Sequence, residues 1–230
     1  QLALQVAQTE KSILEKMDYK KAYKDLYMPK KKPSAIQVPK MTFIMVDGRG
    51  NPNTSKDYKD AMEILYGLSF TIKMSKMSGR KPEGYFEYVV PPLEGLWWQE
   101  GVHGVDYARK ADFQWISLIR LPEFVTEEAF HWAIREAAEK KKQDFSRVEF
   151  FSWEEGLCVQ CMHLGPYDDE PATVALLDAF IAEQGLENDM SDTEAGRHHH
   201  EIYLSDPRRT APEKLKTVLL CGFQAVPETV

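Results

Sequence analysis

The sequence lacks the residues and runs that mark several common classes of protein. Only three cysteines occur among 230 residues, and they are scattered, which argues against a disulfide framework. No apolar run approaches the eighteen residues that a membrane span needs, and residues 1–16 lack the basic-then-apolar order of a secretory signal. We therefore expect a soluble, cytoplasmic protein with no membrane partner.

Basic residues are also in the minority. The chain has 29 Lys and Arg against 36 Asp and Glu, a net charge of −7. Because binding to phosphate needs concentrated positive charge, this balance predicts no nucleic-acid partner. One basic stretch, Lys20–Lys32, has tyrosines between its lysines and indicates a solvated amphipathic helix that leads into a linker, with a weak polyanion contact as the alternative.

Several catalytic and metal-binding motifs are missing. No GxSxG, GxxxxGK or HExxH occurs, and Gly48–Gly50 is too short for a dinucleotide-binding loop. The CxxC at Cys158–Cys161 falls on a predicted strand, where its two sulfurs point to opposite faces, so we expect buried structural thiols. On a strand, at most two of the histidines at 198–200 share a face, so we predict neither a metal site nor a cofactor.

The order of the predicted elements repeats. Residues 1–39 read as an N-terminal helix and linker, followed by a domain over 40–226. The order strand, helix, strand, strand occurs twice, in modules of about 40–145 and about 146–226. The first module has strands at 41–46, 85–90, 93–98 and 113–121, a helix at 54–72 and a bridging helix from 126. The second has a strand pair at 148–153 and 157–164, a helix around 174–181, an acidic loop at 187–194 and strands at 198–205 and 216–226.

The strand at 198–205 carries the main candidate site residue. Its alternation places Ile202 and Leu204 on one face and Glu201 with Tyr203 on the other. If both long helices cover one side of a single sheet, the apolar face meets them and Glu201 looks out from the opposite side. An ordinary solvated strand face is the alternative interpretation.

Aromatic residues are plentiful, at 11% of the chain with five Trp and ten Tyr. Taken singly, most such residues belong to a core or a surface. Together with a carboxylate at the junction of two similar units, they fit a slot for planar ligands, since rings stack on aromatic walls. The candidates for this wall are Tyr85, Tyr88, Trp97, Trp98, Trp132, Trp153, Tyr167 and Tyr203.

Several stretches resemble the stand-alone GyrI-like small-molecule-binding proteins. The resemblance runs from about Met17 to Val226, and its most specific motifs are Gly165-Pro166-Tyr167 and Glu201–Pro207. It implies an α+β fold of two βαββ (SHS2-type) modules with pseudo-twofold symmetry, an antiparallel sheet with helices on one side and a ligand cleft between the modules. The chain has no helix-turn-helix region, so the regulatory role of DNA-binding members does not carry over.

The resemblance also implies roles for particular residues. Glu201 takes the place of the acidic pocket residue that favours cationic or polar aromatic ligands, and Tyr203 and Tyr167 match positions that line the cleft. Some stand-alone members are implied to hydrolyse cyclopropane-bearing genotoxins. On that basis Glu201 is the expected general base and Tyr203 its catalytic partner, and the expected ligand-binding residues are Tyr167, Trp97, Trp98, Tyr88 and Trp132.

Three classes of function stay open at this point. The first is a hydrolase that detoxifies planar electrophiles, and the second is a non-catalytic sensor or sequestering protein for xenobiotics. The third is an inhibitor that binds a macromolecule through the basic stretch Lys20–Lys32. The sequence does not give the natural ligand, the oligomeric state or the faces that Trp97 and Trp98 take.

Overall fold

The computed structural model describes residues 16–190 and 197–225. It is a mixed α/β structure around an antiparallel sheet, in the order β4-β1-β3-β2-β6-β7-β5. The strands are β1 (Ser34–Arg49), β2 (Leu93–Trp98), β3 (Gln114–Arg120), β4 (Glu149–Leu164), β5 (Leu186–Asn188), β6 (His199–Tyr203) and β7 (Lys216–Ala225).

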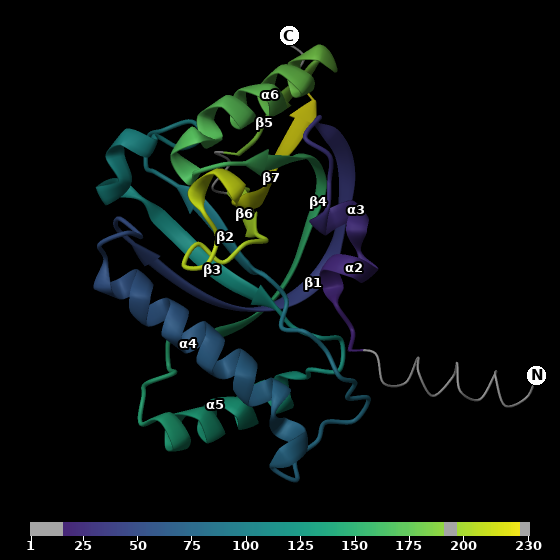
Figure 1. Ribbon diagram of the computed structural model, residues 1–230, viewed down its shortest axis with the longest axis vertical. Helices are drawn as coiled ribbons and strands as arrows, with labels where there is room; N and C mark the ends of the chain where they lie inside the picture. Colours follow the sequence, from purple (N-terminus) through teal and green to yellow (C-terminus); the bar gives the residue numbers. More distant parts are fainter. Residues whose placement is uncertain (1–15, 191–196, 226–230) are drawn as a thin grey trace, which may run out of the picture.

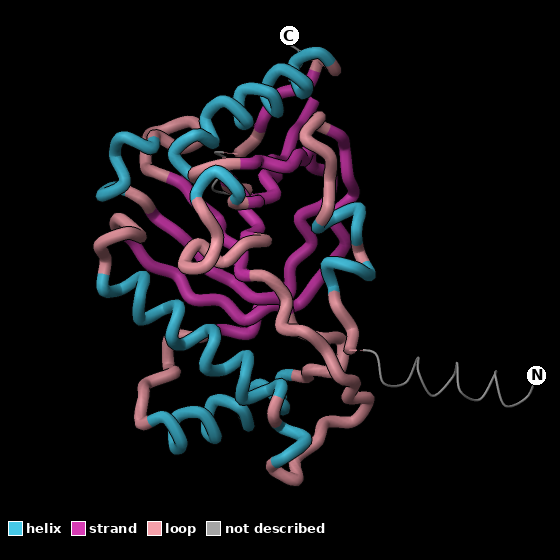
Figure 2. Tube along the Cα trace, in the orientation of Figure 1, coloured by secondary structure: helices cyan, strands magenta, loops and turns pink. Residues whose placement is uncertain are grey.

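The sheet curves until its two ends meet. The first part of β4 pairs with β1, and its last part, Cys158–Leu164, pairs with β7. The six longer strands therefore form a closed ring, drawn as the curved magenta wall of Figure 2. Because the wall is closed, it has an inner face as well as an outer one.

Helices cover the outer face of this wall. In Figure 1, α4 and α5 lie below the sheet and α6 lies above it. The helices are α2 (Tyr19–Ala22), α3 (Lys24–Tyr27), α4 (Lys56–Lys73), α5 (Glu127–Lys141) and α6 (Glu170–Glu183), with short 3-10 turns η1 (Ser75–Met77), η2 (Tyr107–Asp112), η3 (Tyr167–Asp169) and η4 (Pro212–Lys214). None of the helices in the described ranges is long and apolar enough to cross a bilayer.

Strand alternation divides the core into an inner and an outer part. Along β1, Phe43 belongs to the inner cluster, whereas Ile44 packs on the outer side under α4. Along β7, Leu220 faces inward and Leu219 packs on the outer side in the cluster under α6. The inner cluster is completed by the N-terminal turns α2 and α3, which bury Tyr19, Leu26 and Tyr27 in it.

Many predicted elements are confirmed by the structure. The strand at 93–98 is β2, the strand at 113–121 is β3, and the predicted helices correspond to α4, α5 and α6. Their ends follow capping chemistry, since Ser55 and Thr126 accept hydrogen bonds from the first turns of α4 and α5. The element order β1-α4-β2-β3 and then β4-α6-β6-β7 also matches the expected order, with the short β5 added.

Other predictions were wrong. The linker over 30–39 ends early, because β1 begins at Ser34 and its first residues pair with β4. No strand forms at 85–90 beyond an isolated bridge between Tyr88 and Met17, since Pro91 and Pro92 lack the amide donors that a ladder needs. The pair at 148–164 is one strand, not a hairpin, because β1 is long enough to pair across Gly156, whose φ is +78°.

The predicted N-terminal helix and acidic loop lie only partly within the described residues. Residues 16–28 form the two short turns α2 and α3 in place of one amphipathic helix. Of the acidic loop at 187–194, the first residues join β5, and 191–196 lie outside the described ranges, as do residues 1–15.

The largest correction concerns the face of β6. Ile202 packs in the inner cluster, while Tyr203 packs against the outer cluster under α4. Glu201 and Tyr203 therefore lie on the same side as the long helices. The expectation was wrong because the closed ring gives the sheet a second apolar face, and this inner face takes the aliphatic side chains of β6.

Candidate functional site

Glu201 lies where the two halves of the chain meet. In the second half it stands opposite Leu219 of β7, and across the junction it stands opposite Gly95 of β2. Its side chain is nearly buried, with the residue 6% exposed. The carboxylate therefore sits at the boundary between the halves.

Both oxygens of Glu201 have hydrogen-bond partners. Oε1 lies 3.0 Å from Nε2 of His199, and Oε2 accepts from the hydroxyl of Tyr203 at 2.5 Å. The same hydroxyl accepts from Nε1 of Trp97 at 2.8 Å. A chain of polar contacts thus runs from β2 to β6, with the carboxylate at its end.

Glycine at position 95 makes this chain of contacts possible. A Cβ there would stand 2.5 Å from Nε1 of Trp97 and 2.8 Å from the hydroxyl of Tyr203, which is closer than atoms approach. Gly95 thus leaves room for the Trp97–Tyr203 hydrogen bond directly across from Glu201.

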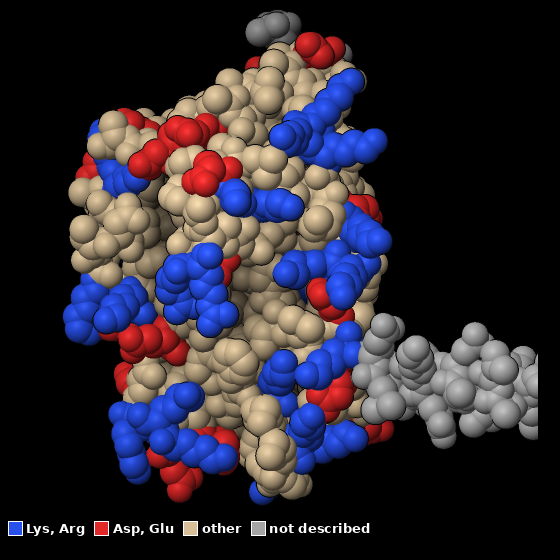
Figure 3. All heavy atoms as spheres, in the orientation of Figure 1, with Lys and Arg blue, Asp and Glu red and all other residues tan. Residues whose placement is uncertain are grey.

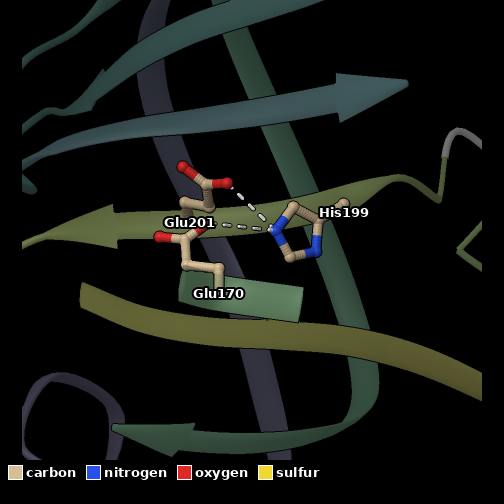
Figure 4. Close-up of side chains that lie close together, drawn as sticks. All are labelled: Glu170, His199 and Glu201. Atoms are coloured by element: carbon tan, nitrogen blue, oxygen red, sulfur yellow. Dashed lines mark hydrogen bonds and ion pairs between the residues drawn. The ribbon is translucent and has the colours of Figure 1, made fainter. Parts of the chain in front are cut away.

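A second carboxyl group reaches the same point from a helix. Glu170 is the first residue of α6 and is fully buried, and its Oε2 accepts from the hydroxyl of Tyr107 at 2.8 Å. This oxygen lies 4.0 Å from Nε2 of His199, so the imidazole faces both carboxyl groups, as Figure 4 shows. The cluster of Glu170, His199 and Glu201 is called the acid–imidazole cluster below.

The acid–imidazole cluster shifts the pKa values of its members in opposite directions. Burial and then the charge of Glu201 raise the pKa of Glu170 to about 8. Burial alone would lower the pKa of His199, but its hydrogen bonds to the two carboxyl groups outweigh that effect and raise it to about 9. Burial would raise the pKa of Glu201. The hydrogen bond from His199 and the charge of His199 outweigh burial, so the pKa of Glu201 is lowered.

The same three side chains have the spacing of a metal site. One donor atom from each lies within 4.8 Å of the others, and all three residues are buried. Two carboxylates and an imidazole are ligands that a divalent transition metal accepts. The same donor atoms also hydrogen bond within the cluster, so a bound cation would have to replace the proton on Nε2 of His199.

Half-buried aromatic rings surround the cluster. Tyr167 of η3 meets the ring of Tyr203 edge-on at 5.7 Å, and Tyr58 of α4 lies 5.8 Å from the ring of Trp97. Tyr58, Tyr167 and Tyr203 are each partly exposed, unlike the carboxylate below them. The rings therefore offer accessible surface next to a nearly buried charge. In Figure 3, acidic and basic groups alternate over the visible face, and uncharged surface is recessed near its centre.

The tyrosine hydroxyls of this wall stay protonated. Burial, followed by the charge of Glu201, raises the pKa of Tyr167 to about 12 and that of Tyr203 well above its ordinary value. The same two causes raise the pKa of Tyr58 and Tyr107. All four are hydrogen-bond donors at physiological pH.

The structure brings together only some of the residues predicted for the site. Glu201, Tyr203, Tyr167 and Trp97 lie around one point, whereas Trp98 projects to the other face of β2 and stacks on His198 at 4.1 Å. Tyr88 is buried against Phe124, and Trp132 belongs to α5, which packs on α4 away from β6 in Figure 1. Among the described residues, the hydrogen bonds of Glu201 go to His199 and Tyr203, and neither Tyr88 nor Trp132 takes part in them.

Four residues of the site were not predicted from the sequence: Tyr58, Tyr107, Glu170 and His199. Glu170 at a helix start has the pattern of a dipole-stabilising residue, which gives no sign of a pocket. Side chains two residues apart on a strand lie on the same face, so His199 lies on the face of Glu201. This alternation was the one signal in the sequence that pointed to His199 as a site residue.

Comparisons with known proteins identify a family and several similar structures. A family model described as "GyrI-like small molecule binding domain" matches residues 31–221. The crystal structure of an uncharacterized conserved protein from Listeria innocua is 48% identical, with a TM-score of 0.85 over 91% of this chain and 100% of its own. A hydrolase from Listeria innocua is 47% identical, with a TM-score of 0.83 over the same shares.

A more distant structure shares the fold alone. The C-terminal domain of EcmrR is 10% identical, with a TM-score of 0.51 over 85% of this chain and 98% of its own. The comparison with curated proteins gives no match.

Proposed function

Because the chain belongs to the GyrI-like small molecule binding domain family, we propose that it binds planar aromatic small molecules above Glu201 and opens the cyclopropane ring of suitable ones with water. The proposed ligand class includes neutral and cationic planar aromatic molecules. The ligand lies between Tyr58, Tyr167 and the Trp97–Tyr203 pair.

One observation carries the binding proposal: a nearly buried carboxyl group has partly exposed aromatic residues around it. Rings in offset or edge-on contact with a planar ligand add about 0.5–1.5 kcal/mol each beyond the burial of area. A few polar groups beneath such rings fix the orientation of the ligand, which is the usual composition of a small-molecule site.

The catalytic proposal assigns a proton transfer to Glu201. Its lowered pKa keeps it ionised, so it accepts a proton from a water while the water oxygen bonds to a carbon of the strained ring. The ring carbon–carbon bond breaks, and its electron pair moves into the conjugated carbonyl of the substrate. Tyr167 donates a hydrogen bond to the oxygen that gains charge, or Tyr203 does so once its hydroxyl proton leaves Oε2 of Glu201, and this oxygen finally receives the proton from Glu201.

The hydrolase from Listeria innocua supports this catalytic proposal, since it is 47% identical over 91% of the chain. We also infer that the halves are related by a pseudo-twofold axis. The strands that join them pair like with like, β1 with β4 and β2 with β6.

The test separates binding from turnover. Thermal unfolding with a panel of planar aromatic compounds measures binding, since a ligand at one hundred times its Kd stabilises the fold by about 2.7 kcal/mol. Mass spectrometry of a cyclopropane-bearing member of the panel measures ring opening. Glu201→Gln is expected to keep binding and lose turnover at least a hundredfold, because the amide accepts no proton.

The matched control is Glu154→Gln, which changes an exposed glutamate of β4 in the same way and should leave both measurements unchanged. Full turnover in Glu201→Gln would rule out the general base. A ligand that binds wild type and returns unchanged would favour the alternative, a non-catalytic binder. That alternative is favoured by one observation, that both oxygens of Glu201 already hold hydrogen bonds.

A further inference from the structure

We propose that His163 is a positioning residue of the site, because its imidazole fixes the turn that carries Tyr167 against the start of α6. The inference rests on the proposed function, in which Tyr167 forms part of the wall around the ligand. His163 does not touch the ligand in this proposal, but it sets where Tyr167 meets it.

His163 lies on the outer face of the ring. It stands on β4 opposite Thr217 of β7 and next to Met162, which packs in the inner cluster. Successive side chains of a strand alternate between its faces, so the imidazole points to the side of the helices. Only 3% of the residue is exposed. A buried imidazole needs hydrogen-bond partners, and each of its two nitrogens has one.

The first partner belongs to the turn after β4. Nε2 of His163 lies 3.0 Å from the carbonyl oxygen of Pro166, and because a carbonyl only accepts, this nitrogen donates. The same oxygen accepts from the amide of Asp169 at 3.0 Å. Gly165, with a φ of +129°, turns the chain back so that Pro166 reaches the imidazole. The imidazole thus holds the peptide group that leads directly into Tyr167.

The second partner belongs to α6. Nδ1 of His163 lies 2.8 Å from the hydroxyl oxygen of Thr173. Thr173 comes three residues after Glu170, so the two side chains leave neighbouring positions on one face of the helix. The N-cap residue of α6, Asp169, makes no side-chain capping bond. One imidazole therefore joins the turn that carries Tyr167 to the first turn of the helix that carries Glu170.

The place of Tyr167 decides its contacts with Tyr203 and with a ligand. Its ring meets that of Tyr203 edge-on at 5.7 Å. Ring contacts depend on distance and angle, and a displacement of about 1 Å in a group that positions a substrate can cost about a hundredfold in rate. A turn that shifts would weaken the ring contact and the hydrogen bond that Tyr167 is proposed to donate.

The first measurement follows the ring of Tyr167 without a ligand. Protein labelled with 3-fluorotyrosine gives a fluorine NMR spectrum, in which Tyr167→Phe identifies the resonance of Tyr167. In His163→Leu, which loses both hydrogen bonds, this resonance should shift or broaden. In His163→Gln, whose amide can still donate to the Pro166 carbonyl, it should stay closer to its position in wild type.

The second measurement is the affinity for acridine, a planar aromatic fluorophore, by fluorescence titration. His163→Leu should weaken binding about tenfold when Tyr167 is present and less than about twofold in a Tyr167→Ala background, because the effects of residues that act through one another do not add. If His163→Leu does not fold, Thr173→Val takes its place in both backgrounds. It removes one of the two hydrogen bonds and should give a smaller loss that also depends on Tyr167.

A second buried histidine supplies the control. His198 is 7% exposed and stacks on Trp98, which projects to the other face of β2. His198→Leu also removes a buried imidazole, and it should change neither the resonance of Tyr167 nor the affinity for acridine.

The outcomes separate this inference from the proposed function. An unchanged Tyr167 resonance in His163→Leu, or an equal loss of affinity with and without Tyr167, would overturn the inference and leave the proposed function in place. If wild type binds neither acridine nor the wider aromatic panel, the proposed function fails, and His163 then has no ligand wall to position.

Discussion

At the scale of single residues, three neighbours on β6 lie in two different environments. His199 and Glu201 face the long helices and share the acid–imidazole cluster. His200 points to the inner face, where its Nδ1 and Nε2 each lie 2.8 Å from a carboxylate, Glu155 and Glu94 respectively. The alternation of side chains along a strand is thus enough to give the adjacent His199 and His200 different carboxylate partners.

The first prediction concerns the buried carboxyl group of Glu170. Its folded pKa of about 8 lies above the ordinary 4.5, so its contribution to stability is full below pH 4.5 and is lost as pH rises through about 8. In Glu170→Gln the side chain does not ionise, so this loss of stability at high pH is absent. Urea unfolding from pH 4.5 to 8.5 should show the free energy of unfolding of wild type falling relative to the variant.

An exposed aspartate serves as the control for this pH dependence of stability. Asp168→Asn, next to the same helix start, changes a mostly exposed carboxylate and should follow wild type across the range. A constant difference between wild type and Glu170→Gln would show that Glu170 ionises normally in the folded protein.

At the scale of elements, β6 is a five-residue strand that depends on its neighbours. It pairs with β2 on one side and β7 on the other, and His200 adds a link across the interior to β4 through Glu155. Burial would lower the pKa of His200, but the two carboxylates outweigh it and raise it to about 10. The imidazolium therefore connects three strands of the ring, and it helps to hold the strand that carries Glu201.

The second prediction follows from this link. His200→Asn leaves Glu94 and Glu155 buried without their cation, which should cost about 3–5 kcal/mol in the free energy of unfolding at pH 6. The stabilisation by His200 is present below its ordinary pKa of 6.5 and is lost as pH rises through about 10. Denaturant titrations should therefore show the variant approaching wild type between pH 6.5 and 10.

His131 on the exposed side of α5 is the matched histidine. His131→Asn should change the free energy of unfolding by less than about 0.5 kcal/mol, as surface substitutions usually do. An equally small effect at position 200 would mean that the interior carboxylates do not need a cation.

At the scale of the whole molecule, the N-terminal turns close the inner face of the ring. Arg120, at the end of β3, lies 4.5 and 4.7 Å from the ring centroids of Tyr19 and Tyr23, which stack on each other. It also reaches the hydroxyl of Tyr27 and pairs with Glu123, whose other oxygen accepts from Tyr19. Residues 16–33 are thus tied to the sheet, although none of them forms one of its strands.

The third prediction tests this attachment. Arg120→Met keeps much of the side-chain volume but removes the two cation–π contacts, which are worth about 0.5–2 kcal/mol each. Hydrogen exchange followed by mass spectrometry should show faster exchange in residues 16–28 than in wild type. Hydrogen exchange in the strands of the sheet should increase less.

Arg147→Met serves as its control, because Arg147 pairs with Asp57 and a backbone carbonyl on the outer side, apart from these turns. Protection of residues 16–28 that is unchanged in Arg120→Met would contradict the proposed attachment. A uniform loss of protection would indicate a general loss of stability.

The local pattern of the sequence determined the elements with strong periodicity. The helical faces of α4, α5 and α6 and the strands β2, β3 and β7 follow from apolar spacing and caps, which act between residues close in the chain. The same spacing placed Glu201 and Tyr203 on one face of β6, and the motifs around them pointed to the family.

Only the tertiary structure decided whether this face of β6 points to the interior of the ring or to the helices, and which residues contact it. Closure of the ring through β4 and β7 gave the sheet an apolar interior, and this drew Ile202 inward and turned Glu201 toward the helices. Contacts such as that between Glu170 and His199 join residues 29 positions apart in the chain, on α6 and β6. No local period carries such information, because these contacts depend on how the elements pack, which is set by the closing of the whole sheet.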